Sequence, residues 1–305
     1  MVPRQRGLVG PAEGARGGGL RRPRPVTAVV LGAGGQVGRA LTRRFPDAVA
    51  LTRADLDVGD PAAVAAHDWT GVDLVVNAAA WTAVDAAQDP ANHAAVRAVN
   101  VDGVGALADA ARAHGFLLVH FSTEYVFDGG SSGPIPEDAP VHPLSVYGQS
   151  KADGDALVTA LDRHLLLRTT WVVGEGRNFV RTMAGLADRG VSPSVVADQV
   201  GRPTLADDLA AAVDHLVGAG LTGTYNVTCG GEPASWADVA EVVFAARGRD
   251  PRDVRRVSTA EYSAGKPDLA PRPLNSVLDL AKLEATGFRP REWRTAVQAH
   301  LTTAG

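Results

Sequence analysis

The sequence contains few of the features that build disulfides, thiolate metal sites or membrane spans. Its 305 residues include one cysteine, Cys229, so neither an intrachain disulfide nor a CxxC pair can form. Nowhere do about 18 apolar residues follow one another, so no membrane span is expected. These absences predict a protein of the reducing cytoplasm that makes no contact with a membrane.

Negative charge dominates the body of the chain. The formal net charge is −4, but residues 1–25 carry six Arg and one Glu, which leaves −9 for the remainder. An acidic body argues against nucleic acid as a partner. Residues 1–25 have no apolar core of a signal peptide, and their Gly, Arg and Pro content predicts a disordered tail. A basic arm for an anionic partner and a start codon assigned too far upstream are the alternatives.

From Val26 onward, short β-branched runs alternate with Ala-rich amphipathic stretches. This alternation predicts an α/β fold with a Rossmann-type, doubly wound parallel sheet over residues 26–173 and a ligand crevice at the carboxyl ends of its strands. After about residue 174 the alternation stops, so 174–305 are expected to form a smaller substrate-binding region, partly interleaved with the first. Expected strands are 26–32, 48–51, 73–78, 116–122 and 164–173, and expected helices are 36–45, 101–114 and 145–161.

Three glycines follow the first expected strand at the mouth of the first helix. Gly32, Gly35 and Gly38 form GxxGxxG, a weak motif alone that gains meaning from its strand-turn-helix setting. There the missing side chains let a pyrophosphate approach the free N–H groups of a helix N-terminus. The alternative is a tight turn without a ligand. The pattern predicts dinucleotide binding.

Arginine replaces the acidic residue that usually ends the second strand of such folds. Arg53 stands there, and a guanidinium suits the 2′-phosphate of NADPH better than the free hydroxyl of NADH. We therefore expect NADPH, with NADH as the second choice. Asp57 is a candidate contact on the adenine side, or equally a solvated loop acid.

Tyr147 and Lys151 have the least accidental spacing in a chain of four tyrosines and three lysines. Four residues apart on an expected helix, they share one face. A neighbouring ammonium is expected to lower the phenol pKa, so that Tyr147 can donate a proton to a carbonyl oxygen that receives hydride.

Small and polar residues end the expected strands. Ser122, Thr123 and Glu124 follow 116–122, where a hydroxyl can hydrogen-bond a developing alkoxide or merely cap a turn. Residues 77–79 (Asn-Ala-Ala) could let a cofactor lie against the backbone. Trp171 could stack on a base or sugar, although an aromatic there is more often part of a core.

Segments spread over the chain resemble the extended short-chain dehydrogenase/reductases, and within them the dTDP-4-dehydrorhamnose reductases. The resemblance covers nearly everything after residue 26. It implies a Rossmann domain, a smaller C-terminal sugar-nucleotide domain and reduction of the 4-keto group of a dTDP-4-dehydro-6-deoxysugar, as in the conversion of dTDP-4-dehydro-L-rhamnose to dTDP-L-rhamnose. The segments are LGAGGQVG (31–38), DLVVNAAAWTAVD (73–85), VHFSTEYVFDG (119–129), VYGQSK (146–151), LRTTWVVGEGRNFVRTM (167–183), DQVGRPT (198–204) and RPLNSVLD (272–279).

The resemblance also implies roles for single positions. Thr123, Tyr147 and Lys151 match the catalytic triad, with Tyr147 as proton donor and Lys151 also holding the nicotinamide ribose. Substrate contacts match Thr123, Glu124 and Trp171. Cofactor contacts match Gly35, Gln36 and Val37 in the phosphate turn, Asp57 and Val58 at the adenine, and Ala80, Trp81 and Thr82 beside the cofactor.

The chain departs from the family pattern at three positions. Glu124 replaces the more usual Asp, and Trp81 stands where Tyr or His is frequent, so the sugar stays open. Ala40 occupies the place of a carboxylate that some members use for a metal at a dimer interface. We therefore expect no metal, and a homodimer stays open as the assembly.

Three other functions compete with the reductase interpretation. An epimerase or dehydratase has the same triad, but a dehydratase needs an Asp-Glu pair after the threonine and only Glu124 is acidic here. A dTDP-dihydrostreptose synthase of streptomycin-type antibiotic biosynthesis fits the Ala-, Arg- and Gly-rich composition, which suggests an actinomycete-like genome. A non-catalytic regulatory subunit would share the fold, although the complete triad speaks against it.

Overall fold

A parallel sheet of six strands forms the centre of the computed structural model, which describes residues 27–303. The predicted disordered tail, residues 1–25, lies outside the described residues. The strand order is β10-β5-β4-β3-β1-β2, and every neighbouring pair is parallel. The predicted Rossmann-type α/β fold is therefore confirmed. The strands are β1 (Ala28–Leu31), β2 (Val49–Leu51), β3 (Leu74–Asn77), β4 (Leu117–Thr123), β5 (His164–Thr169) and β10 (Gly223–Asn226).

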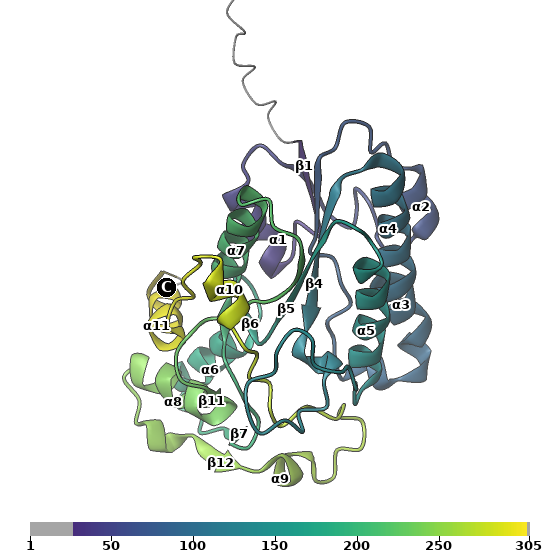
Figure 1. Ribbon diagram of the computed structural model, residues 1–305. Coiled ribbons are helices and arrows are strands. Elements are labelled where there is room, and N and C mark those ends of the chain that lie inside the picture. Colours follow the sequence, from purple (N-terminus) through teal and green to yellow (C-terminus); the bar gives the residue numbers. More distant parts are fainter. Residues whose placement is uncertain (1–26, 304–305) are drawn as a thin grey trace, which may run out of the picture.

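Helices cover both faces of this sheet (Figure 1). On one face, α1 (Gln36–Arg44) and α7 (Ala206–Gly218) pack onto alternate strand residues in one apolar cluster. On the other face, α2 (Pro61–Ala66), α4 (Gly103–His114) and α5 (Val146–Thr159) enclose a second cluster. Helices on both faces and mostly apolar, buried inner strands are typical of parallel sheets.

A separate apolar cluster lies below the sheet in Figure 1 and is built from residues after 171. Its helices are α6 (Phe179–Asp188), α8 (Trp236–Ala246) and α11 (Trp293–Thr303), with the short α9 (Thr259–Ser263) and α10 (Ala281–Ala285) nearby. Because β10 and α7 also come from this half of the chain but complete the central sheet, the two halves interleave in space. The strand pairs of this part are β6 (Val172–Val173) with β9 (Thr204–Leu205), β7 (Ser194–Val196) with β12 (Arg255–Val257), and β8 (Val200–Gly201) with β11 (Ala234–Ser235).

Two expected elements differ in the structure. The strand expected over 164–173 ends at Thr169, because Trp171 adopts a positive φ of 44° and turns the chain toward β9. The helix expected from residue 101 begins earlier, with α3 (His93–Arg97) and a π-helical turn (Ala98–Asp102) leading into α4. In that turn the Asn100 side chain is buried and bonds the backbone of Trp81, which no helical periodicity reveals.

Within residues 27–303, no helix is both long enough and apolar enough to cross a membrane.

Helix α4 approaches the chain before α2 through a glycine. A Cβ added at Gly103 would lie 1.9 Å from the carbonyl oxygen of Val58, far inside a van der Waals contact. Gly105, one half-turn further along the same helix, would place its Cβ 3.6 Å from a Leu157 methyl group, which is an ordinary distance. The two glycines therefore form a matched pair, one required by packing and one not.

Replacing each glycine by alanine should have opposite effects on stability. Gly103→Ala should lower the free energy of unfolding by about 1–3 kcal/mol, because the helix must move off the Val58 carbonyl. Gly105→Ala should leave it unchanged or raise it by up to about 1 kcal/mol, since alanine loses less backbone entropy in a helix. Urea unfolding followed by circular dichroism measures both. Equal effects of the two changes would contradict the close helix approach.

Candidate active site

Helix α5 presents a row of buried polar side chains to the sheet. Tyr147, Lys151 and Asp155 follow one another at intervals of four residues, and all three are buried. Ser145 caps the start of this helix, because its hydroxyl accepts a hydrogen bond from the backbone N–H of Gly148 at 3.1 Å. The structure thus places Tyr147 and Lys151 on one face, as their spacing predicts.

The Lys151 ammonium group is enclosed by the end of β4. Its Nζ donates to the carbonyl oxygen of Phe121 at 2.7 Å and lies 2.9 Å from Nε2 of His120. Burial lowers the pKa of Lys151 to about 8, although the charge of Asp155 acts in the opposite direction. Lys151 therefore titrates near the physiological range, where a small change in its surroundings changes its charge.

Ser122 hydrogen-bonds the last residue of this row, Asp155. Its hydroxyl donates to Asp155 at 2.7 Å, and both groups are buried. Asp155 also lies 3.5 Å from the guanidinium of Arg168. The Ser122 hydroxyl is thus engaged by the buried charges along α5.

Thr123 and Glu124 form a buried hydrogen-bonded pair. The Thr123 hydroxyl lies 2.7 Å from a carboxyl oxygen of Glu124, which is only 2% exposed. Burial raises the pKa of Glu124 from 4.5 to about 7, while the bond from Thr123 acts in the opposite direction. Near neutral pH the carboxyl group is therefore protonated in part of the molecules and can donate to Thr123.

Tyr147 is held as a phenol. Burial raises its pKa above the ordinary value of 10, and the nearby Glu124 adds to this rise, while a hydrogen bond with Thr123 acts against it. The prediction that the neighbouring ammonium of Lys151 lowers this pKa is wrong for the protein alone, because desolvation outweighs any such attraction. A group that keeps its proton suits the role of proton donor rather than base.

A second tyrosine and a distant ion pair support Tyr147. The ring of Tyr125 meets that of Tyr147 edge-on, with centroids 5.4 Å apart at 79°. Arg272 hydrogen-bonds Tyr125 and binds both carboxyl oxygens of Asp85 at 2.8 and 2.9 Å. Sequence reasoning missed these three residues as site residues. The available signal was that all three lie inside segments that carry the family resemblance.

A cavity of about 620 Å³ opens above the glycine turn at the end of β1. An added Cβ at Gly34 would meet nothing within 4 Å. The N-cap residue of α1 is Gly35, which has no side chain, so no side-chain bond caps the first N–H groups of this helix. The space and the first N–H groups of α1 therefore suit a dinucleotide pyrophosphate. Predicted cofactor residues that line this cavity are Gly32, Gly35, Arg53, Asp57, Val58, Ala80, Trp81 and Thr82.

Gln36, Val37 and Gly38, also predicted at the phosphate turn, do not line this cavity. The Gln36 side chain instead accepts the backbone N–H of Gly174 at 2.8 Å and so ties α1 to the second half of the chain. Gly38 is required by the turn itself, since an added Cβ would lie 2.1 Å from the Gly32 oxygen. A ligand contact from Gln36 or Val37 would have to use the backbone.

A second cavity of about 610 Å³ lies among residues of the second half of the chain. Phe179, Trp236 and Tyr262 give it aromatic walls, and Arg272 adds a cation. Trp171 is not in the wall but stacks on Trp236, with centroids 3.8 Å apart and planes at 19°. The aromatic walls suit a ligand with a ring, whereas the guanidinium of Arg272 is already paired with Asp85.

The Tyr147 cluster lies between the two cavities. Trp81 lines the first cavity and packs into the same apolar cluster as Tyr147. Arg272 lines the second and reaches Tyr147 through Tyr125. A cofactor in one cavity and a substrate in the other would therefore meet at Tyr147.

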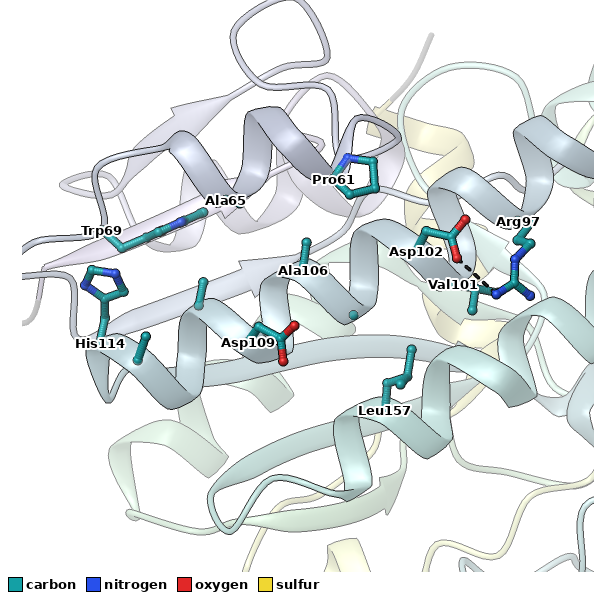
Figure 2. A pocket seen from close by; sticks show the side chains of 13 residues that line it. Pro61, Ala65, Trp69, Arg97, Val101, Asp102, Ala106, Asp109, His114 and Leu157 are labelled. Atoms are coloured by element: carbon teal, nitrogen blue, oxygen red, sulfur yellow. Dashed lines mark ion pairs between the residues drawn. The ribbon is translucent and has the colours of Figure 1, made fainter.

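Another hollow, shown in Figure 2, lies between α2, α4 and α5. It measures about 680 Å³ and contains the exposed ion pair of Arg97 and Asp102 at 3.2 Å. It shares no residue with the predicted site. Among residues 27–303, no group of three or more His, Cys, Asp or Glu side chains is placed to hold a metal ion, and Ala40 is buried in α1.

Comparison with known proteins agrees with this geometry. Residues 26–305 match the profile of a protein family described as RmlD substrate binding domain. The chain is 40% identical over 291 residues to a dTDP-4-dehydrorhamnose reductase of Aggregatibacter actinomycetemcomitans, which covers 88% of this chain and 96% of that protein. It is 41% identical over 283 residues to a probable dTDP-4,6-dihydroxy-2-methyloxan-3-one 4-ketoreductase of Streptomyces antibioticus, which covers 88% and 92%.

A solved structure shares the fold over most of the chain. The dTDP-4-dehydrorhamnose reductase of Bacillus anthracis, crystallised in complex with NADP, superposes with a TM-score of 0.84 at 29% identity and covers 91% of this chain and 99% of its own.

The raised pKa of Glu124 predicts how stability varies with pH. Because the folded protein binds this proton more tightly than the unfolded chain, its contribution is complete below pH 4.5, falls between pH 4.5 and about 7, and is constant above. Glu124→Gln should remove up to about 3 kcal/mol of that fall. Urea unfolding at several pH values, compared with the parent, measures the difference. A parent and variant with parallel pH profiles would show that Glu124 ionises normally.

Proposed function

Because the chain belongs to the RmlD substrate binding domain family, we propose that it uses NADPH to reduce the 4-keto group of a dTDP-4-dehydro-6-deoxysugar, with dTDP-4-dehydro-L-rhamnose as the first candidate. The observation that carries the proposal is the position of Tyr147, which hydrogen-bonds Thr123, shares a helix face with Lys151 and is linked to the first cavity through Trp81 and to the second through Tyr125 and Arg272. Relatives named as reductases of dTDP-keto-sugars and a neighbour crystallised with NADP support the substrate class and cofactor.

The chain's own residues would manage the proton. NADPH, when bound, supplies the hydride to the carbonyl carbon. The phenol of Tyr147 donates its proton to the carbonyl oxygen as negative charge develops there, and the Thr123 hydroxyl hydrogen-bonds the same oxygen. The positive charge of Lys151, when present, stabilises the phenolate that remains, and Lys151 is also proposed to bind the nicotinamide ribose. Glu124 keeps the Thr123 hydroxyl in place from the other side.

The sugar nucleotide is proposed to occupy the second cavity, within the predicted region 174–305. Its aromatic walls suit the base of the nucleotide. Trp171 and Glu124 do not line this cavity but are proposed as further substrate contacts. The acidic body fits a small-molecule substrate rather than nucleic acid, and we propose the cytoplasm as compartment and a homodimer without bound metal as the assembly.

A second candidate substrate is the precursor of an antibiotic sugar, as in dTDP-dihydrostreptose synthesis. The 41% identical ketoreductase of Streptomyces antibioticus favours it, together with the actinomycete-like composition. The reaction would use the same residues, so only the product distinguishes the two.

Changing Arg53 tests the cofactor. Arg53 lines the first cavity beside Asp57, 3.5 Å away, and its side chain is 73% exposed, so it is accessible to a 2′-phosphate. Arg53→Ala should raise the KM for NADPH about 10- to 100-fold and leave the KM for NADH nearly unchanged, since a charge-assisted bond is lost only with NADPH. Arg97→Ala, which removes another exposed arginine ion pair, is the control. Equal losses with both cofactors would overturn the NADPH preference.

Changing Tyr147 tests the reaction. With NADPH and dTDP-4-dehydro-L-rhamnose generated in place, the parent should oxidise NADPH and form a dTDP-6-deoxysugar. Tyr147→Phe should lose at least about 100-fold in kcat but bind NADPH as before, because the lost proton acts in the transition state. Tyr225→Phe, at a buried tyrosine of β10, should keep its activity. A parent that binds NADPH yet turns over no dTDP-4-keto-6-deoxysugar would instead support the regulatory-subunit alternative.

A further inference from the structure

A histidine lies directly behind Lys151 and connects it to the end of β3. His120 on β4 has Nε2 2.9 Å from the Lys151 amine and Nδ1 3.1 Å from the amide nitrogen of Asn77. All three side chains are buried, with exposures of 1% for Asn77, 1% for His120 and 2% for Lys151. No water can therefore replace a missing partner in this row.

The hydrogen-bond roles in this row are mutually dependent. The Asn77 amide oxygen accepts the backbone N–H of Ala79 at 3.1 Å, so its amide nitrogen faces His120 and can only donate. Nδ1 of His120 must then be the acceptor, and a neutral ring carries its proton on Nε2, facing Lys151. An ammonium group has only donors, whereas a neutral amine has a lone pair for this proton. The observed arrangement thus fits the uncharged form of Lys151.

The charged form of Lys151 requires a different arrangement of the same atoms. Nε2 must then accept from the ammonium group, and the ring proton moves to Nδ1. Asn77 must turn its amide by half a rotation to offer its oxygen, and it gives up the bond to Ala79. Ala79 lines the first cavity, so this end of the row lies at the proposed cofactor site.

We propose that the Asn77–His120 pair controls the charge of Lys151. His120 is a positioning residue: it stays uncharged and exchanges one tautomer for the other as Lys151 gains or loses its proton. The effect of this pair on activity rests on the proposed reductase function. The tautomer exchange itself is a property of the protein alone.

The other charged groups near Lys151 come from α5 itself, from β5 and from the turn after β4. Asp155 on the same helix attracts the ammonium group and is itself bound by Ser122 and by Arg168 of β5. On the Tyr147 side, Glu124 is the nearest acid. Burial and the charge of Lys151 both lower the pKa of His120, which agrees with a ring that remains neutral. Substitutions of His120 leave all of these groups in place.

Nitrogen NMR of the full-length protein, with ¹⁵N-labelled histidine, tests the tautomer exchange directly. His120 is assigned as the signal missing from His120→Gln. At high pH its proton should reside on Nε2, and it should move to Nδ1 as the pH falls through the pKa of Lys151, which lies at about 8. An imidazolium signal for His120 between pH 6 and 9, or one tautomer throughout this range, would overturn the proposal.

Two substitutions of His120 should move the activity profile in opposite directions. In His120→Gln, an amide oxygen accepts from the Lys151 ammonium group without a tautomer change, which favours the charged lysine. The midpoint of the fall in kcat at high pH should therefore rise by about half a pH unit or more. His120→Leu removes the acceptor, so the midpoint should fall by a similar amount. His164→Gln, at a partly buried histidine of β5 outside the site, should leave it unmoved.

These kinetic outcomes separate the proposal from a structural role. A histidine that only fills space would change kcat or stability and leave both midpoints in place, and shifts in the same direction would equally contradict charge control. If the parent shows no reductase activity, the proposed function fails, while the NMR measurement still decides whether His120 exchanges tautomers.

Discussion

The burial of Lys151 is the constraint on which the site depends. Removing an ammonium group from water is costly unless other polar groups replace the lost hydration. In this protein the replacement comes from three directions: the Phe121 carbonyl oxygen, the charge of Asp155 and the His120 ring in the tautomer whose Nε2 accepts a hydrogen bond. Asp155 in turn needs Ser122 and Arg168. One buried charge therefore determines which residues can stand along the inner face of α5 and at the end of β4.

The same burial brings two unlike groups close to neutrality. The pKa of Glu124 rises to about 7 and that of Lys151 falls to about 8, in each case mainly because desolvation disfavours the charged form. Tyr147 lies between a raised acid and a lowered base and keeps its own proton more firmly than in water. Environments that move titratable groups in opposite directions are typical of sites that transfer protons. An uncharged His120 that exchanges its tautomers would let Lys151 gain or lose its proton as its surroundings change.

Local patterns predicted much of the fold and part of the site. The glycine turn after β1 and the four-residue spacing of Tyr147 and Lys151 depend on nearby residues, so the sequence displays them directly. The Arg272–Asp85 pair joins residues 187 apart, and no local pattern reveals it. In the sequence, His120 is an ordinary residue of an apolar strand. Its contacts with Asn77 of β3 and Lys151 of α5 exist only in the folded protein. Trp171 ends its strand early because it adopts a positive φ. Such a φ is typical of glycine, so an aromatic residue at this position does not predict it. The direction of the Tyr147 pKa was wrong for a related reason, because burial is a property of the whole fold.

Isotope transfer tests the central claim most directly, namely that this cluster completes a reduction rather than an internal rearrangement. The purified protein would be supplied with NADPH carrying deuterium at both positions of nicotinamide carbon 4 and with dTDP-4-dehydro-L-rhamnose, and the product analysed by mass spectrometry and NMR. We predict one deuterium per product molecule, located on carbon 4 of the sugar. A product without deuterium, formed with no net oxidation of NADPH, would contradict the account and would point to an epimerase or a dehydratase.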